Sequence, residues 1–372
     1  MKIGITCYPS VGGSGVIATE LGKLLAENGH EIHFITSGLP FRLDKVHPKI
    51  FYHEVEVNHY PVFKYPPYDL SLASKMAEII DQEKLDVLHV HYAIPHAICA
   101  ILARDIATHK VKVVTTLHGT DITVLGIDET FKKMIRYGIE QSDAVTSVSN
   151  SLSTQTKEMI ETKQPISVIY NFVNEKEYYP KTAPLLREQY NIKSHEKVVI
   201  HISNFRKVKR VHDVIHTFNE IVKKSESKLL LIGDGPEYSA MKKLVVNLQL
   251  EDDVLFLGKQ NNISELLSIA DVMLLMSEKE SFGLVLLEAM ACGVPGIGTN
   301  IGGIPEVVRH GETGYLVEKG DIKQAATYTI ELLNNPDKLQ RFSENALKHV
   351  ERQFQSNIIV QQYINLYKQL LD

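Results

Sequence analysis

The first half of the chain alternates short hydrophobic runs with longer stretches in which hydrophobic positions recur every three or four residues. This alternation predicts parallel strands joined by right-handed helical crossovers. The strands predicted in this half are residues 2–7, 31–36, 86–90, 111–117 and 144–148, and a helix is predicted near residues 16–27. We therefore expect a doubly wound α/β domain at the start of the chain.

The alternation stops at a polar, tyrosine-rich segment, residues 171–184, and then begins again. Strands are predicted at residues 198–202, 228–232, 254–257 and 272–276, and purely helical patterns at 322–333, 336–353 and 357–371. A chain of 372 residues exceeds what one hydrophobic core usually supports. We expect two doubly wound, Rossmann-like domains that face each other across a cleft: residues 1–170, and residues 171–355. The last helix, about residues 356–372, is expected to pack back on the first domain.

The composition narrows the class of protein. A hydrophobic share of 44% and a charged share of 23% are typical of a globular protein, and a net charge of -5 disfavours a nucleic-acid partner. The chain opens without signal-peptide features and has no apolar run near the roughly 20 residues that span a bilayer. We expect a cytoplasmic protein without stable membrane association. Cys7, Cys99 and Cys292 lie far apart, which favours three small buried residues over a disulfide or a zinc site.

A glycine-rich segment, residues 9–15, follows the first predicted strand and precedes a helix. Its Gly13, Ser14 and Gly15 allow backbone amides to approach a ligand at the helix N-terminus. Residues 13–18 also match G-x-G-x-x-A, one form of the dinucleotide fingerprint. The second strand, however, lacks the acidic residue that would hold the adenosine ribose. We favour an anionic or polyol ligand over NAD, and a simple tight turn remains an alternative.

Two loops of the second half also follow predicted strands. Residues 203–210 contain four basic side chains, a charge that suits a diphosphate, although charge runs are usually solvated surface loops. Residues 233–237 form a glycine turn before a helix predicted to start at Pro236. Glycine turns are common at such places, so this second loop is a weak signal.

The most specific signal is the segment 278–295, where a helix predicted from Gly283 directs its free amides and positive dipole end toward the cleft. Glu280 and Glu288 are eight residues apart in it. Each carboxylate can accept hydrogen bonds from two hydroxyl groups, as the vicinal diols of a sugar or a ribose offer them. A surface position is the alternative for Glu288, but its neighbours are apolar, and a carboxylate among them needs a partner.

Glu280 and Glu288 match the E-x7-E element of the retaining glycosyltransferases of GT-B architecture, and the chain resembles the fourth family of these enzymes over nearly all of its length. Residues 7–37, 89–96, 116–121 and 203–210 are similar to members that transfer N-acetylglucosamine from UDP-N-acetylglucosamine to L-malate, the first step of bacillithiol biosynthesis. The resemblance thus implies that activity, with α-linked product.

The resemblance also implies roles for residues of the second domain. Glu288 would hold the ribose of UDP, and Glu280 the transferred sugar. Lys209 matches the phosphate-binding lysine, but Asn204 stands where the family usually has an arginine, and Arg206 is our candidate for the missing charge. The remaining implied nucleotide-sugar contacts are the amides of Ser281, Phe282, Gly283 and Leu284, together with Gly235 and Glu237.

In the first domain, the resemblance places the glycine-rich segment near the phosphates and acceptor, and His118 near the C6 hydroxyl of the donor sugar. A lone histidine is more often structural, so the loop context of His118, residues 118–121, carries this expectation. Malate is a dianion that needs hydrogen-bond donors and a cation. The candidates for binding malate are Tyr92, Thr120, Asn150 and Arg136.

The expected mechanism is front-face displacement, in which the acceptor hydroxyl attacks from the side that UDP leaves. The chain contains no D-x-D motif, so we expect neither a metal nor another cofactor, and Lys209, Arg206 and helix dipoles would neutralise the diphosphate. Three alternatives stay open: a related transferase with a lipid or polysaccharide acceptor, a UDP-sugar epimerase, and a non-catalytic nucleotide-binding regulator. The choice between glucose and N-acetylglucosamine and the formation of a homo-oligomer also stay open.

Overall fold

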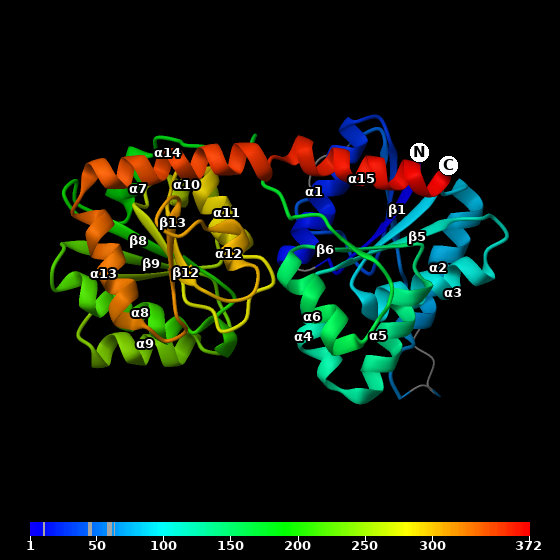
Figure 1. The fold of residues 1–372 in the computed structure, drawn as a ribbon, viewed down its shortest axis with the longest axis horizontal. Coiled ribbons are helices and arrows are strands. Elements are labelled where there is room, and N and C mark those ends of the chain that lie inside the picture. Colours follow the sequence, from blue (N-terminus) through cyan, green and yellow to red (C-terminus); the bar gives the residue numbers. More distant parts are fainter. Residues whose placement is uncertain (10–11, 44–46, 58–61, 63) are drawn as a thin grey trace. The chain divides into compact units, whose positions relative to one another are not determined.

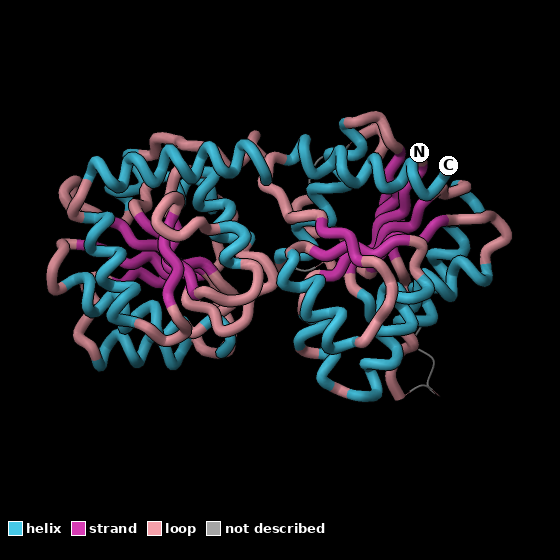
Figure 2. Tube along the Cα trace, in the orientation of Figure 1, coloured by secondary structure: helices cyan, strands magenta, loops and turns pink. Residues whose placement is uncertain are grey.

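The computed structural model describes residues 1–372 except 10, 11, 44–46, 58–61 and 63 (Figure 1). The chain divides into two compact units. The first unit comprises Met1–Asn171 and Ser356–Asp372, and the second comprises Phe172–Gln355. Each unit contains a β-sheet with helices packed around it (Figure 2). Among the described residues, no helix is both long and apolar enough to cross a membrane.

The sheet of the first unit has seven strands in the order β3-β2-β1-β4-β5-β6-β7, and all its pairings are parallel. The strands are β1 Lys2–Thr6, β2 Glu31–Thr36, β3 Ile50–Glu54, β4 Val87–His91, β5 Lys112–Leu117, β6 Ala144–Ser147 and β7 Ile166–Val168. The strand order reverses between β1 and β4, which is where ligands bind in open α/β sheets. The hydrophobic pattern had not predicted β3 and β7. Both are edge strands, and neither is a continuous buried run.

Helices connect these strands. They are α1 Gly13–Glu27, α2 Tyr68–Glu83, α3 Ile98–Ile106, α4 Thr120–Thr123, α5 Glu129–Gln141 and α6 Asn150–Ile160. The last helix, α15 Ser356–Leu371, also belongs to this unit and packs against α1 (Figure 1). The hydroxyl of Tyr367 on α15 lies 2.7 Å from Nδ1 of His89 on β4. A polar contact at the centre of the sheet therefore fastens the end of the chain to the first unit.

The second unit repeats the same plan with a six-stranded parallel sheet in the order β10-β9-β8-β11-β12-β13. Its strands are β8 Lys197–Ile202, β9 Ser227–Ile232, β10 Val254–Gly258, β11 Val272–Leu275, β12 Gly296–Thr299 and β13 Gly314–Val317. Its helices are α7 Pro184–Gln189, α8 Val211–Val222, α9 Tyr238–Asn247, α10 Ile263–Ser268, α11 Leu284–Ala291, α12 Ile304–Val307, α13 Ile322–Leu333 and α14 Pro336–Gln353. The strand order reverses between β8 and β11. Their following loops are thus expected to lie side by side.

The predicted fold class, two doubly wound Rossmann-like sheets with helices at the C-terminus, is confirmed. All three cysteines are buried and free, as predicted. One helix start was wrong: α9 begins at Tyr238, not at Pro236. The amide of Tyr238 donates to the carbonyl of Gly235 at 3.0 Å, so residues 235–238 form a turn before the helix.

Candidate functional site

The loop that follows β8 is held in place by a buried histidine. Nδ1 of His201 lies 2.8 Å from the carbonyl oxygen of Leu274 on β11, which can only accept, so this nitrogen donates. Nε2 then accepts from the hydroxyl of Ser203 at 2.8 Å, and Ser203 Oγ accepts from the amide of Phe205 at 3.3 Å. Burial lowers the pKa of His201 to about 4, so the ring stays neutral at neutral pH. This chain of bonds orients residues 203–206.

Two glycines let the loop after β9 pack against the loop after β8. A Cβ on Gly233 would lie 1.8 Å from the carbonyl oxygen of Ser203, and one on Gly235 would lie 1.9 Å from that of Asn204. The amide of Glu237 donates to the carbonyl of Phe205 at 3.0 Å. The structure thus brings Asn204, Gly235 and Glu237 together, because only glycine leaves room for this approach of two backbones.

The loops after β8 and β11 meet through an ion pair. Nζ of Lys209, in a 3-10 turn over Lys207–Lys209, lies 2.6 Å from Oε2 of Glu280. The side chains are 20% and 16% exposed, and the amide of Glu278 donates to the carbonyl of Val208 at 2.7 Å. Arg206 precedes this turn and is exposed, and its guanidinium forms no hydrogen bond or ion pair with any residue that the structure describes. The structure therefore joins Lys209 to Glu280 and leaves the Arg206 guanidinium accessible.

Residues 280–283 form a tight turn that begins α11. Gly283 caps this helix with a φ of 97°, a conformation that favours glycine. The carbonyl of Glu280 accepts from the amide of Gly303 at 3.1 Å, and a Cβ on Gly302 would lie 1.9 Å from that carbonyl oxygen. Gly302 and Gly303 therefore shape the turn. Sequence reasoning missed them, although the adjacent glycines after β12 were a visible signal.

The other residues predicted around this turn differ in position and burial. Phe282 is buried, and its ring centroid lies 5.8 Å from that of Phe354. Ser281 and Leu284 are half-buried. Glu288 lies inside α11 and is 8% exposed. It is five positions after Gly283, which corresponds to about 7.5 Å along the helix. Glu280 and Glu288 thus occupy different places, as two separate carboxylate roles require.

In the first unit, the segment after β1 faces the residue after β4. Ser14 Oγ and the hydroxyl of Tyr92 lie 2.6 Å apart, next to Gly13 and Gly15 in the first turn of α1. Ser10 and Val11 of the predicted glycine-rich segment lie outside the described residues. Tyr92 has a φ of 90°, and burial raises the pKa of its phenol to about 12. Its hydroxyl therefore stays protonated and available as a donor.

His118 follows β5 directly and lies in a group of aromatic side chains. Its Nε2 is 2.8 Å from Nδ1 of His91, the last residue of β4, and its ring centroid is 5.4 Å from that of Tyr92. Burial lowers the pKa of His118 to about 3, so the ring is neutral at neutral pH. The structure thus brings His118, Tyr92 and Ser14 to neighbouring places. Sequence reasoning gave no role to His91.

Sequence reasoning also missed Asp121, which fastens the loops after β4 and β5 to each other. Its carboxylate accepts from the amide of Ala93 at 2.9 Å and from that of Gly119 at 3.0 Å. Asp121 is fully buried, and this burial raises the pKa of its carboxyl group to about 6. The signal was its place in the motif at residues 118–121, in which only His118 and Thr120 had received a role.

The four predicted acceptor residues do not all come together. Thr120 is exposed at the start of α4, and Asn150 is exposed at the start of α6, where its amide nitrogen donates to the Tyr170 hydroxyl at 2.9 Å. Arg136 instead donates from Nε to the carbonyl of Ile160 at 2.7 Å, at the other end of α6. A helix of eleven residues spans about 16 Å. The Arg136 guanidinium and Asn150 are therefore at opposite ends of α6.

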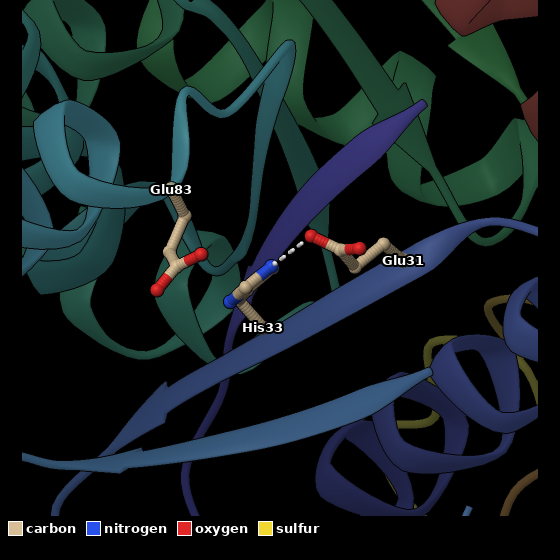
Figure 3. Close-up of side chains that lie close together, drawn as sticks. All are labelled: Glu31, His33 and Glu83. Carbon is tan, nitrogen blue, oxygen red and sulfur yellow. Dashed lines mark hydrogen bonds and ion pairs between the residues drawn. The ribbon is translucent and has the colours of Figure 1, made fainter. Parts of the chain in front are cut away.

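A histidine and two glutamates of the first unit lie close together, near the start of β2 and the end of α2. Glu31, His33 and Glu83 have ligand atoms within 4.8 Å of one another (Figure 3). Nε2 of His33 lies 3.1 Å from a Glu31 oxygen, and the Lys2 ammonium lies 2.8 Å from the same oxygen. The Lys2 ammonium thus already supplies a cation to this cluster. The cluster is distinct from the residues after β1, β4 and β5.

Sequence comparison relates the chain to known glycosyltransferases. Residues 11–177 match the Glycosyltransferase Family 4 and residues 183–349 match the Glycosyl transferases group 1. The chain is 60% identical over 371 residues to the N-acetyl-alpha-D-glucosaminyl L-malate synthase of Bacillus anthracis, with 100% of this chain and 97% of the relative covered.

Solved structures show the same fold. A glycosyltransferase from Rickettsia africae superposes with a TM-score of 0.84 at 25% identity, covering 100% of this chain and 98% of the other. The Anabaena protein HepE in complex with UDP-glucose superposes with a TM-score of 0.82 at 22% identity, covering 99% of this chain and 100% of the other.

Proposed function

Because this chain belongs to the family-four glycosyltransferases, we propose that it transfers N-acetylglucosamine from UDP-N-acetylglucosamine to the hydroxyl of L-malate. The product is N-acetylglucosaminyl-α-malate, formed with retention of the anomeric configuration, and UDP leaves. This is the first step of bacillithiol biosynthesis. The observation that carries the proposal is the 60% identity to the N-acetyl-alpha-D-glucosaminyl L-malate synthase, which covers 100% of this chain and 97% of the relative.

The second unit is the proposed nucleotide-sugar site. Glu288 binds the ribose hydroxyls, and Glu280 with the amides of residues 281–284 binds the transferred sugar and the diphosphate. Lys209 and Arg206 supply positive charge, and Asn204, Gly235 and Glu237 line the nucleotide. The adjacency of the loops after β8, β9 and β11 supports this assignment, because one bound molecule can contact all three.

The first unit is the proposed acceptor site. Ser14 and Tyr92 form a hydroxyl pair beside the N-terminus of α1, whose first amides have no acceptor within the helix and favour an anion such as a malate carboxylate. Thr120 and Asn150 offer further polar groups at starts of helices. We exclude Arg136 from this site, since its guanidinium caps the end of α6 and pairs with Glu161.

In the proposed reaction the malate hydroxyl attacks the anomeric carbon from the face that UDP leaves, and a donor phosphate oxygen accepts the proton. The C–O bond to the diphosphate breaks as the new one forms, so negative charge grows on the leaving group. Lys209, held by Glu280, and the amides at the start of α11 stabilise that charge. No step requires a metal ion.

UDP release tests the proposal. Purified protein is incubated with UDP-N-acetylglucosamine, with and without L-malate, in excess EDTA, and the product is analysed by NMR. We expect malate-dependent UDP release and an α-linked product. UDP release without malate would indicate hydrolysis, and sugar conversion without an acceptor would indicate an epimerase. A β-linked product would contradict retention.

A further inference from the structure

Four histidines lie together at the centre of the first unit. The ring centroids of His89 and His91 are 4.6 Å apart, and those of His91 and His118 are 5.0 Å apart. His89, His91 and His96 are fully buried, whereas His118 is half-buried. His118 is thus the member of this group that can reach a ligand. Its neighbours decide which of its ring nitrogens carries the proton.

The bond between His91 and His118 joins two neutral rings. Burial lowers the pKa of both side chains far below neutral pH, to about 3 for His118. A neutral imidazole carries one N–H and one bare nitrogen. Nδ1 of His91 and Nε2 of His118 are 2.8 Å apart, so one of them donates and the other accepts. Either His91 donates and His118 carries its proton on Nδ1, or the reverse holds.

Nε2 of His91 distinguishes the two arrangements. This atom is buried and has no hydrogen-bond partner among the described residues. If His118 donated, the proton of His91 would sit on Nε2, as a buried N–H without an acceptor. If His91 donates, Nε2 is a bare nitrogen. Buried N–H groups without an acceptor are rarer than under-satisfied acceptors, and so donation by His91 is favoured.

His96 provides an independent example in the same group. Its Nδ1 contacts the carbonyl oxygen of His91, which can only accept, so the proton of His96 is on Nδ1. Its Nε2 is consequently bare, and it too is buried without a partner among the described residues. The interior around β4 therefore already holds one bare Nε2 of a neutral histidine.

We propose that His91 is a positioning residue that holds His118 in the Nδ1–H form, so that His118 presents a hydrogen-bond donor to an oxygen atom of the bound donor sugar. The identity of that ligand rests on the proposed function. The Asp121 carboxylate supports the arrangement, because it accepts from the amides of Ala93 and Gly119, which follow His91 and His118 in the chain. The donor nitrogen is therefore oriented before substrate binds.

The proton position is measured directly by NMR of protein labelled with ¹⁵N-histidine, at neutral pH and without substrate. His118→Asn identifies the signals of His118. We expect wild-type His118 to carry its proton on Nδ1. A proton on Nε2 in the wild-type protein overturns the proposal whatever the activity. This measurement does not depend on the proposed function.

Two variants test the consequence. His91→Leu removes the donor, whereas the side-chain amide of His91→Asn can take the place of Nδ1–H. We expect His91→Leu to shift His118 toward the Nε2–H form and to lower kcat/KM for UDP-N-acetylglucosamine about tenfold, the typical effect of one hydrogen bond, with the KM for L-malate unchanged. His91→Asn should restore most of both. His195→Leu, at a side chain 57% exposed in the second unit, should not change the state of His118.

The outcomes separate this proposal from the proposed function. An unchanged His118 in folded His91→Leu, or equal losses of kcat/KM in the Leu and Asn variants, contradicts positioning by His91. If wild-type His118 carries its proton on Nδ1 but L-malate does not stimulate UDP release, the proposed function fails while the assignment of the proton stands.

Discussion

The ammonium nitrogen of Lys209 lies 2.6 Å from a carboxylate oxygen of Glu280, although the two residues are 71 positions apart. They meet because β8 and β11, which precede their loops, are neighbours in the sheet. Two residues with separate implied roles, one for the phosphate and one for the sugar, thus form one ion pair. A substitution at either position changes the electrostatic environment of the other.

We predict that Lys209→Ala lowers kcat by about 10²- to 10³-fold, the typical loss when a donor to developing charge is removed. The KM for UDP-N-acetylglucosamine should change less, because the ground-state diphosphate keeps its contacts with the α11 amides and Arg206. Lys209→Arg should restore little, since a planar guanidinium does not reproduce a compact ammonium. Steady-state kinetics in excess EDTA measures both parameters. Near-normal kcat in Lys209→Ala, or wild-type activity abolished by EDTA, contradicts this prediction.

Glu288→Ala should weaken the binding of UDP at least about tenfold, since a charged acceptor for the ribose hydroxyls is lost. Glu280→Ala should instead lower turnover and the discrimination between donor sugars. Calorimetric titration of UDP compares the affinities. Glu278→Ala is the matched control, because the Glu278 side chain pairs with Lys319 at 3.7 Å and has no proposed role. Equal UDP affinity of wild type and Glu288→Ala would refute the ribose contact.

Gly235→Ala should reduce both UDP affinity and thermal stability. The added Cβ would lie 1.9 Å from the Asn204 carbonyl oxygen, so the loop after β8 must move. Gly38→Ala is the control, because among the described residues its Cβ would meet only a Pro9 side-chain atom, at 3.8 Å. Thermal unfolding with and without UDP measures the two effects. Unchanged UDP-induced stabilisation in Gly235→Ala would show that the backbone contact is irrelevant to the nucleotide site.

Arg136→Ala should destabilise the protein by about 1 kcal/mol without changing the KM for L-malate, because its guanidinium holds the end of α6. We expect no larger loss of stability, because the side chain is 35% exposed. Asn150→Ala, at the start of the same helix, should raise the KM for malate. Denaturant unfolding and malate titrations distinguish the two residues. A raised malate KM in Arg136→Ala alone would restore the role expected from sequence.

Stability should fall as the pH is lowered from about 6.5 toward 4. Burial lowers the folded-state pKa of His89 to about 3 and of His96 to about 4, whereas both protonate near 6.5 when unfolded. The unfolded chain therefore binds more protons in this window, and stability rises with pH across it by up to about 1.4 kcal/mol per pH unit for each such histidine. Asp121 acts in the opposite direction, because its folded-state pKa is raised to about 6.

His89→Gln removes the contribution of one buried histidine to this pH dependence. Denaturant unfolding between pH 4.5 and 6.5 should give a smaller slope of stability against pH than in wild type, whatever the absolute stability of the variant. His195→Leu is the control, because that side chain is exposed to solvent in the second unit. Parallel slopes for wild type and His89→Gln would show that His89 is not held neutral.

The hydrophobic pattern alone determined the two doubly wound sheets and the C-terminal helices, because strand and helix periods are local properties of the chain. The motif that contains Glu280 and Glu288 placed the chain among glycosyltransferases for a similar reason: spacing within one loop and helix is visible in the sequence. Strands β3, β7, β12 and β13 were not predicted. The edge strands β3 and β7 lack a continuous buried run, and β12 and β13 are only four residues long and contain glycine, which weakens a strand pattern.

The tertiary structure decided which polar groups meet. Lys209 reaches Glu280, and His91 reaches His118, only because β8 adjoins β11 and β4 adjoins β5. Arg136 had the right charge for malate, but helix packing directs its guanidinium to the end of α6. Strand order and side-chain direction depend on contacts between residues far apart in the chain. A local pattern records which face of an element is buried, and it does not record which partner covers that face.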